Sequence, residues 1–196
     1  MAHYRAIVAA GAAIVGLIKE RYPRPEFGPS LTVATLLPNA VERGLTGDGI
    51  AICLWRVALN GQRRSRGARV DAFGNRFKPS LPLDLSFLVI PYSSDPERQA
   101  RLLGWVMRAL EDAGPLTAAQ LNFYLAESDI FAPEEDVDLI CDPLALADHL
   151  ALWDRLKQFP PAANYLMRMV LIDSQEAFSE GPPVTTREFQ VGVRSS

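Results

Sequence analysis

Apolar residues fall into well-separated runs along this chain, and their spacing predicts most of its secondary structure. A nearly continuous apolar run fills the N-terminal segment and ends before Pro23 and Pro25, which disfavour a continued helix. The pattern therefore predicts a helix over residues 2–21. Because this helix is apolar nearly all round, we expect it to be sandwiched between other elements.

Several short segments have the composition and alternation of β-strands. In residues 83–92, Leu83, Leu85, Phe87 and Val89 alternate on one face, and both faces become apolar near the end of the segment. This pattern indicates a central strand with helices on both sides. The other predicted strands cover residues 31–36, 50–58, 136–141 and 164–172.

Two further helices are predicted in the second half of the chain. Ser94 and Glu97 have capping-box spacing, Pro96 suits the first helical turn, and Gly114-Pro115 ends the helix. Asp142-Pro143 opens another helix, which carries Leu146, Leu150 and Trp153 on one face, and a shorter helical segment is expected over residues 118–126. Strands and helices that do not strictly alternate favour a single α+β domain with a mixed sheet and about three main helices.

Between Leu59 and Leu81 the apolar pattern gives way to glycine, proline and cationic residues, which predicts a loop or an extended hairpin arm. A solvated loop and a contact with an acidic protein surface are both compatible with this composition. Nucleic-acid binding is the weaker alternative, because only Phe73 and Phe77 are available for base stacking and the net charge is −3. The cations of the arm are Arg63, Arg64, Arg66, Arg69, Arg76 and Lys78.

The C-terminal segment differs from the rest of the chain. It is polar and turn-rich through Gly181-Pro182-Pro183, and then Phe189, Val191 and Val193 alternate with other residues. We therefore divide the chain into a domain over residues 1–174 and a tail over residues 175–196. The alternation makes the tail a candidate edge strand, or a strand donated to a partner.

Composition places the chain among soluble globular proteins, since 48% of the residues are hydrophobic and 22% are charged. The apolar run Ala6–Ile18 is shorter than the roughly 20 residues that span a bilayer, and no small-residue cleavage site follows it. We therefore expect a buried N-terminal helix, no membrane association and a cytoplasmic location. Cys53 and Cys141 each lie in an apolar run, and we expect both to be structural thiols.

Candidate chemistry is sparse. Gly47 and Gly49 lack the lysine and hydroxyl residue of a phosphate-binding loop, and His3 and His149 are the only histidines. The acidic cluster over residues 134–138 lacks the glycine and terminal glutamate of a calcium loop. Asp84 stands alone in an apolar strand, where a position at a sheet surface or subunit contact is expected. We therefore expect no catalytic centre, no metal site and no cofactor.

Four ordered segments together resemble one known family. They are MAHYRAI at the N-terminus, IAICLWRVALN with the arm that follows it, LPLDLSFLVIPY leading into ERQARLLGWVMRALED, and DPLALADHLALWDRLKQ followed by NYLMRMVLIDS. Their order and phrasing resemble the N-terminal domain of the cap proteins of extracellular contractile injection systems, of the antifeeding-prophage and virulence-cassette type. The resemblance covers residues 1–174.

This resemblance implies a non-enzymatic subunit that forms a hexameric ring at the distal end of a tube and sheath and terminates their polymerisation. The implied partners are further copies of the chain and the tube and sheath proteins, with assembly in the cytoplasm and a final location in the particle. Two alternatives remain open at this point: a nucleic-acid-binding accessory protein that uses the arm over residues 63–78, and an unrecognised hydrolase.

Overall fold

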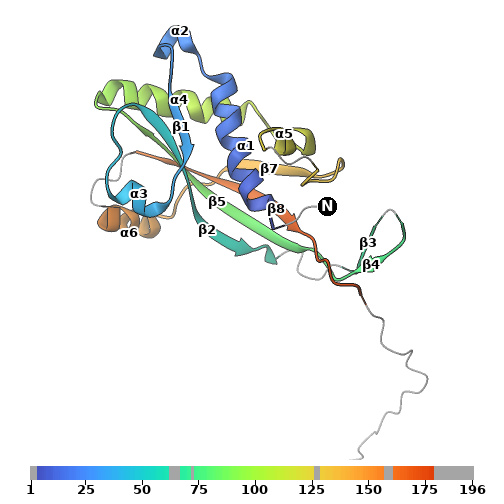
Figure 1. Cartoon of the computed structure of the whole chain (residues 1–196). Coiled ribbons are helices and arrows are strands. Elements are labelled where there is room, and N and C mark those ends of the chain that lie inside the picture. Colours follow the sequence, from blue (N-terminus) through green and yellow to red (C-terminus); the bar gives the residue numbers. More distant parts are fainter. Residues whose placement is uncertain (1–3, 62–66, 72, 126–128, 157–160, 179–196) are drawn as a thin grey trace, which may run out of the picture.

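A twisted six-stranded sheet forms the centre of the molecule (Figure 1). The computed structural model describes residues 4–61, 67–71, 73–125, 129–156 and 161–178. Only the β1–β2 pair is parallel, and the other strand pairs of the sheet are antiparallel. The strands lie in the order β1 (Thr32–Thr35), β2 (Gly49–Leu59), β5 (Leu81–Tyr92), β8 (Ala163–Ile172), β7 (Asp136–Cys141) and β6 (Leu116–Thr117). This mixed sheet with its helices confirms the α+β prediction.

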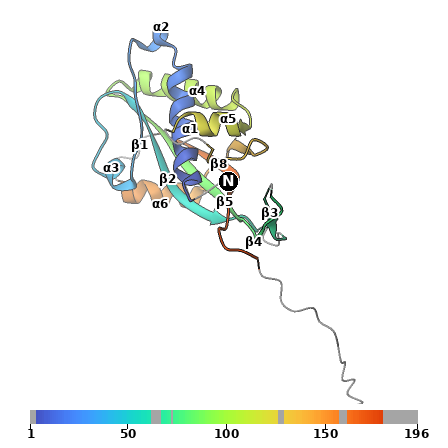
Figure 2. The same ribbon diagram turned by 45° about the vertical axis from the view of Figure 1, so that its right-hand side comes forward.

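Helices cover both faces of the sheet (Figures 1 and 2). The first face packs against α1 (Ala6–Arg21), α4 (Pro96–Glu111) and α5 (Ala118–Phe123), and the second face packs against α3 (Pro38–Glu42) and α6 (Leu146–Leu156). A short helix, α2 (Arg24–Phe27), follows α1.

The alternation of β5 divides the core between the two faces. Leu85, Phe87 and Val89 are buried in the larger cluster with α1, α4 and α5, while Leu88 and Ile90 are buried in the smaller cluster with α3 and α6. The prediction of a central strand covered on both sides is therefore confirmed. The prediction that α1 is sandwiched is also confirmed, since α1 contacts the sheet as well as α4 and α5.

Three helix starts differ from the sequence prediction, and the first of them is that of α1, which begins at Ala6 rather than at residue 2. Asp95, not Ser94, caps α4, because its side chain accepts a hydrogen bond from the Glu97 backbone N–H at 3.0 Å. Helix α6 begins at Leu146 rather than directly after Asp142, because Asp142 still continues the sheet ladder. The Asp142 N–H donates a hydrogen bond to the Asn164 carbonyl, and the Asp142 carbonyl accepts one from the Asn164 side chain.

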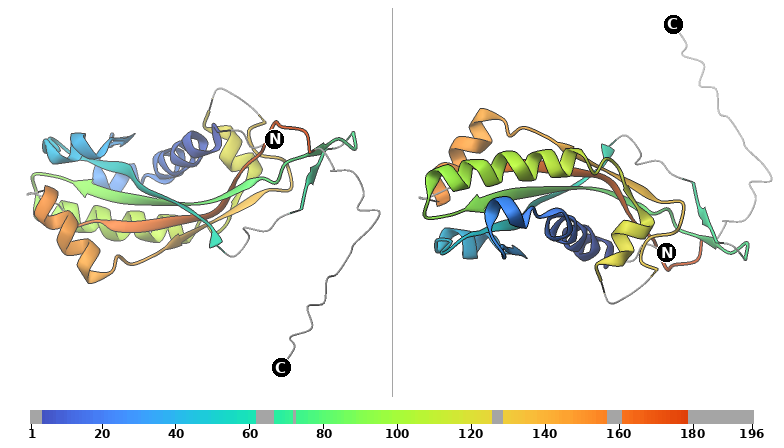
Figure 3. Two further views of the ribbon diagram at one scale, coloured as in Figure 1. Left: turned by 90° about the horizontal axis from the view of Figure 1, so that it is seen from below. Right: turned by 90° about the horizontal axis from the view of Figure 1, so that it is seen from above.

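The arm predicted between residues 59 and 81 contains a small hairpin, β3 (Arg69–Val70) and β4 (Arg76–Phe77). This hairpin projects beyond one end of the sheet, whereas α3 and α6 lie at the other end (Figures 1 and 3). The prediction of a loop or hairpin arm is confirmed. The two ends of the domain therefore present different surfaces.

Candidate assembly surfaces

The base of the arm is fastened to the segment that follows β8. The Arg69 Nε atom lies 3.6 Å from Asp173 Oδ2, and an Arg69 Nη atom donates to the Ser174 carbonyl at 3.3 Å. The same guanidinium lies over the Phe77 ring, 4.4 Å from its centroid. Ser80 Oγ completes the cluster by donating to Asp173 Oδ1 at 2.6 Å. Arg69 and Asp173 therefore connect the hairpin to the sheet end.

Residues 176–178 extend the hairpin along the outer edge of β4. The Lys78 N–H donates to the Glu176 carbonyl and the Phe178 N–H donates to the Arg76 carbonyl, each at 2.9 Å. The Lys78 ammonium also pairs with the Glu176 carboxylate, and the Arg76 guanidinium lies 5.4 Å from the centroid of the Phe178 ring. The arm is therefore one hydrogen-bonded unit with the first residues of the C-terminal tail.

These contacts place three of the residues proposed from sequence for partner binding. Arg69, Arg76 and Lys78 each contact the segment over residues 173–178. The remaining six lie outside the described residues: Arg63, Arg64, Arg66, Phe189, Val191 and Val193. Sequence reasoning did not anticipate these internal contacts, because their partners lie about a hundred positions away along the chain.

The tip of the arm carries a solvent-exposed phenylalanine, Phe73. Phe73 is 91% exposed. The turn beneath it is ordered by Asp71, whose Oδ1 atom accepts from the Phe73 N–H at 2.9 Å and from the Asn75 N–H at 2.8 Å. The Asn75 side chain also donates to Asp71, and this hydrogen bond lowers the pKa of the Asp71 carboxyl. Asp71 therefore orders the backbone of the turn that carries Phe73.

The opposite end of the domain carries an open apolar groove of about 640 Å³ between α3 and α6. Its lining is mostly apolar, and Glu42 and Arg155 contribute charge. Burial raises the pKa of the Cys53 thiol in its lining, as expected for a structural cysteine. The apolar lining consists of Pro38, Val41, Cys53, Trp55, Leu88, Ile90 and Leu152. Sequence reasoning missed this groove, because it forms only where α3 and α6 meet over the sheet.

Helix α6 packs weakly on its own domain. Leu146, Leu150 and Trp153 share a face, as predicted, but they are 74%, 58% and 55% exposed. Leu152 instead turns toward the smaller core cluster, where it is partly buried. Most apolar surface of this helix therefore points away from the core.

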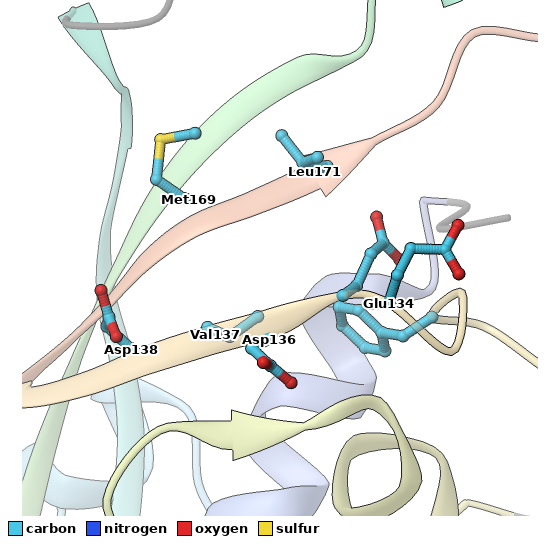
Figure 4. A pocket seen from close by; sticks show the side chains of 8 residues that line it. Glu134, Asp136, Val137, Asp138, Met169 and Leu171 are labelled. Atoms are coloured by element: carbon cyan, nitrogen blue, oxygen red, sulfur yellow. The ribbon is translucent and has the colours of Figure 1, made fainter. Parts of the chain in front are cut away.

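The acidic cluster predicted over residues 134–138 leads into β7 and lines a second groove of about 320 Å³ (Figure 4). Asp136 and Asp138 come from β7, and Met169 and Leu171 come from β8 on the other side. Along the ribbon in Figure 4, Asp136 lies between Glu134 and Asp138. Within the described parts of the chain, no three potential ligands among histidine, cysteine, aspartate and glutamate gather closely enough to hold a metal ion.

The two single residues considered for chemistry both have structural surroundings. Asp84 accepts hydrogen bonds from the Asn60 side chain and from the Met169 backbone N–H. His149 lies in α6, and its ring is 6.3 Å from that of Trp153. None of the helices in the described ranges is long and apolar enough to cross a membrane.

Comparison with known families identifies the family of this chain. The family model described as the Pvc16 N-terminal domain matches residues 9–186. The chain belongs to this family. No curated protein sequence matches this Pvc16 N-terminal domain closely enough to be counted as a relative.

Two solved structures share the fold of this Pvc16 N-terminal domain. One is the sheath/tube terminator of the extracellular contractile injection system PVC in its extended state, with a TM-score of 0.63 and 16% sequence identity over 97% of this chain. The other is the tube-terminating cap of the anti-feeding prophage, with a TM-score of 0.53 and 17% identity over 90% of this chain. The chain spans 64% and 60% of the lengths of these two proteins.

Proposed function

We propose that this chain is a structural terminator subunit that ends the polymerisation of the tube and sheath of a contractile injection system. The observation that carries the proposal is the family match, together with the fold shared over 97% of the chain with a sheath/tube terminator. In this proposal the chain is not an enzyme and needs no cofactor, is assembled in the cytoplasm, and then stays at the distal end of the particle.

The proposed assembly is a hexameric ring on the last layer of the tube. A ring needs a contact between two different surfaces of each subunit, repeated until it closes. The domain has different surfaces at its two ends, which supports this arrangement (Figure 3). One ring face would bind the tube and sheath, and the other would offer no site for a further layer.

The arm and the tail are the proposed contact segments, with the arm binding an acidic surface on a partner. Arg63, Arg64 and Arg66 are the proposed contact residues of the arm. The tail would add a strand to the sheet edge of a partner. Phe189, Val191 and Val193 would share one face of that strand. We do not propose nucleic-acid binding, because the arm cations that the structure describes contact residues 173–178.

Deletion of the gene tests the proposed function directly. Particles from cells that lack the protein should have tubes and sheaths of irregular length in negative-stain images, and the intact gene should restore the normal distribution. A chain truncated after Ser179 should restore it less well while keeping its unfolding midpoint. Replacing Arg63, Arg64 and Arg66 together by serine should also weaken restoration. The control is Arg108→Ser, which changes an exposed arginine of α4 and should not weaken restoration. A normal length distribution in the deletion strain would refute the proposed function.

A further inference from the structure

The arm tip has the properties of an anchor for another protein surface. Phe73 is almost fully exposed, and the turn that carries it is held by two backbone hydrogen bonds to Asp71. Val70, on the same hairpin, is 58% exposed. Aromatic side chains are enriched at protein interfaces, and an ordered turn reduces the entropy lost when such a side chain is bound. The tip is therefore pre-organised for insertion into an apolar pocket.

The groove between α3 and α6 has the properties of a receiving site. Its volume is about 640 Å³, and its lining includes Val41, Trp55 and Leu152. A cavity of roughly 150 Å³ is enough to bind benzene, so this groove has room for a phenylalanine ring and a neighbouring valine. None of the described α6 side chains is fully buried, so the groove wall gains packing when the groove is filled.

The positions of these two features determine which chain can fill the groove. The arm projects from one end of the sheet, and α3 and α6 lie at the other end in every view (Figures 1 to 3). The arm of a chain points away from its own groove, but it points toward the groove of a copy placed head to tail. A contact between two different patches of identical subunits is the kind that generates rings.

We propose that Phe73 at the arm tip of one copy inserts into the α3–α6 groove of the next copy, and that this contact joins neighbouring subunits of the ring. The inference rests on the proposed ring and names its interface. Val70 enters beside Phe73, and Trp55 and Leu152 line the apolar site that receives them. Glu42 and Arg155 add one charge of each sign to the lining, so the apolar residues carry the proposed contact.

Disulfide trapping with the full-length chain tests this contact. Copies carrying Phe73→Cys are mixed with copies carrying Glu42→Cys, an exposed residue of the groove, under mild oxidation. We expect a disulfide-linked dimer that contains one copy of each kind. Phe123→Cys replaces Phe73→Cys in the control, since Phe123 is 76% exposed on α5, and this control should give only background. If Phe73→Cys gives no more dimer than the control, in solution and in assembled particles, the inference is wrong.

Complementation tests the head-to-tail geometry. Phe73→Asp destroys the arm tip and leaves the groove intact, whereas Leu152→Asp destroys the groove and leaves the arm intact. For each variant alone, the protein concentration at which the oligomer dissociates into single subunits should rise about tenfold or more in sedimentation velocity, or the variant should fail to join particles. An equimolar mixture retains one productive contact and should form dimers but no ring. Because Phe73 is exposed, Phe73→Asp should keep the unfolding midpoint, and assembly of this variant like that of the natural chain would overturn the inference.

The two proposals can fail separately. If Phe73→Asp still assembles but deletion of the gene disturbs particle length, the terminator function stands and this interface is wrong. If the trapped dimer forms but deletion leaves particle length normal, the interface stands and the terminator function is wrong.

Discussion

The carboxylate of Asp84 accepts a hydrogen bond of 3.1 Å from the backbone N–H of Met169, across the boundary between β5 and β8. Met169 has a φ of 64°, in the left-handed region that side-chain-bearing residues rarely adopt. The regular pairing of β5 and β8 is interrupted between Leu83 and Leu85, at this same place. Asp84 therefore stabilises a bulge in the sheet, with Asn60 donating to both of its oxygens at 3.0 Å.

Asp84→Ala should destabilise the domain, because it leaves the Met169 N–H and the buried Asn60 amide without their acceptor. A buried donor without its acceptor costs about 1–3 kcal/mol, so the free energy of unfolding should fall by about that amount in urea titrations. Asp84→Asn keeps one acceptor oxygen and should lose less. Equal stability of Asp84→Ala and the natural chain would show that the bulge does not depend on this carboxylate.

Two glycines of α1 should respond to alanine in opposite ways. A Cβ atom at Gly16 would lie 2.1 Å from a ring atom of Tyr124, whereas one at Gly11 would meet its nearest neighbour at 3.6 Å. Gly16→Ala should therefore destabilise the domain by about 1–3 kcal/mol through overpacking. Gly11→Ala should stabilise it by up to roughly 1 kcal/mol through helix propensity. Thermal unfolding of the two variants side by side measures whether each change stabilises or destabilises the domain. An unchanged unfolding temperature for Gly16→Ala would mean that the Tyr124 ring can move away from α1.

Arg69→Ala should release the arm without unfolding the domain. The change removes the ion pair with Asp173, the hydrogen bond to the Ser174 carbonyl and the contact with the Phe77 ring. Because the arm projects from the sheet end, its opening is local. Limited chymotrypsin digestion should cleave at Phe73 and Phe77 several-fold faster, with the unfolding free energy changed by less than about 1 kcal/mol. Arg108→Ala, which breaks an exposed pair with Asp112, is the matched control and should leave the digestion rate unchanged.

Glu135 should make the domain less stable at neutral pH than at mildly acidic pH. Burial raises the pKa of this carboxyl above its usual value of 4.5, although the Ala132 N–H donates to it at 2.7 Å. A raised pKa in the folded state means that the favourable contribution exists at low pH and is lost as the pH rises through the folded pKa. Glu135→Gln should therefore be more stable than the natural chain at pH 7, and the difference should disappear toward pH 4.

Urea midpoints at several pH values measure this difference. The control is Glu134→Gln, at the exposed neighbouring position, which should show a smaller pH-dependent difference. A Glu135→Gln variant that is less stable than the natural chain at pH 7 would mean that the charge itself is stabilised in the folded state.

The sequence by itself determined the fold class and the longer helices and strands, but not the short elements α2, α3 and β6. The strand alternation of β5, the uninterrupted apolar surface of α1 and the hairpin in the arm were all predicted, because each depends on neighbouring residues. The exact helix starts were not predicted, since Ser94 and Asp95 are equally good caps and only the path of the chain selects Asp95. The family was also recognisable from the sequence, because the resemblance lies in the order of whole segments.

Only the tertiary structure decided how the surfaces are used. The sequence placed Leu146, Leu150 and Trp153 on one face of α6, but only the packing shows that this face turns outward, because helical spacing alone cannot tell which side meets the sheet. Arg69 looked like a cation for a partner, but Asp173 lies beside it, because the end of β8 meets the arm. The α3–α6 groove likewise exists only where distant segments meet, and no local pattern encodes it.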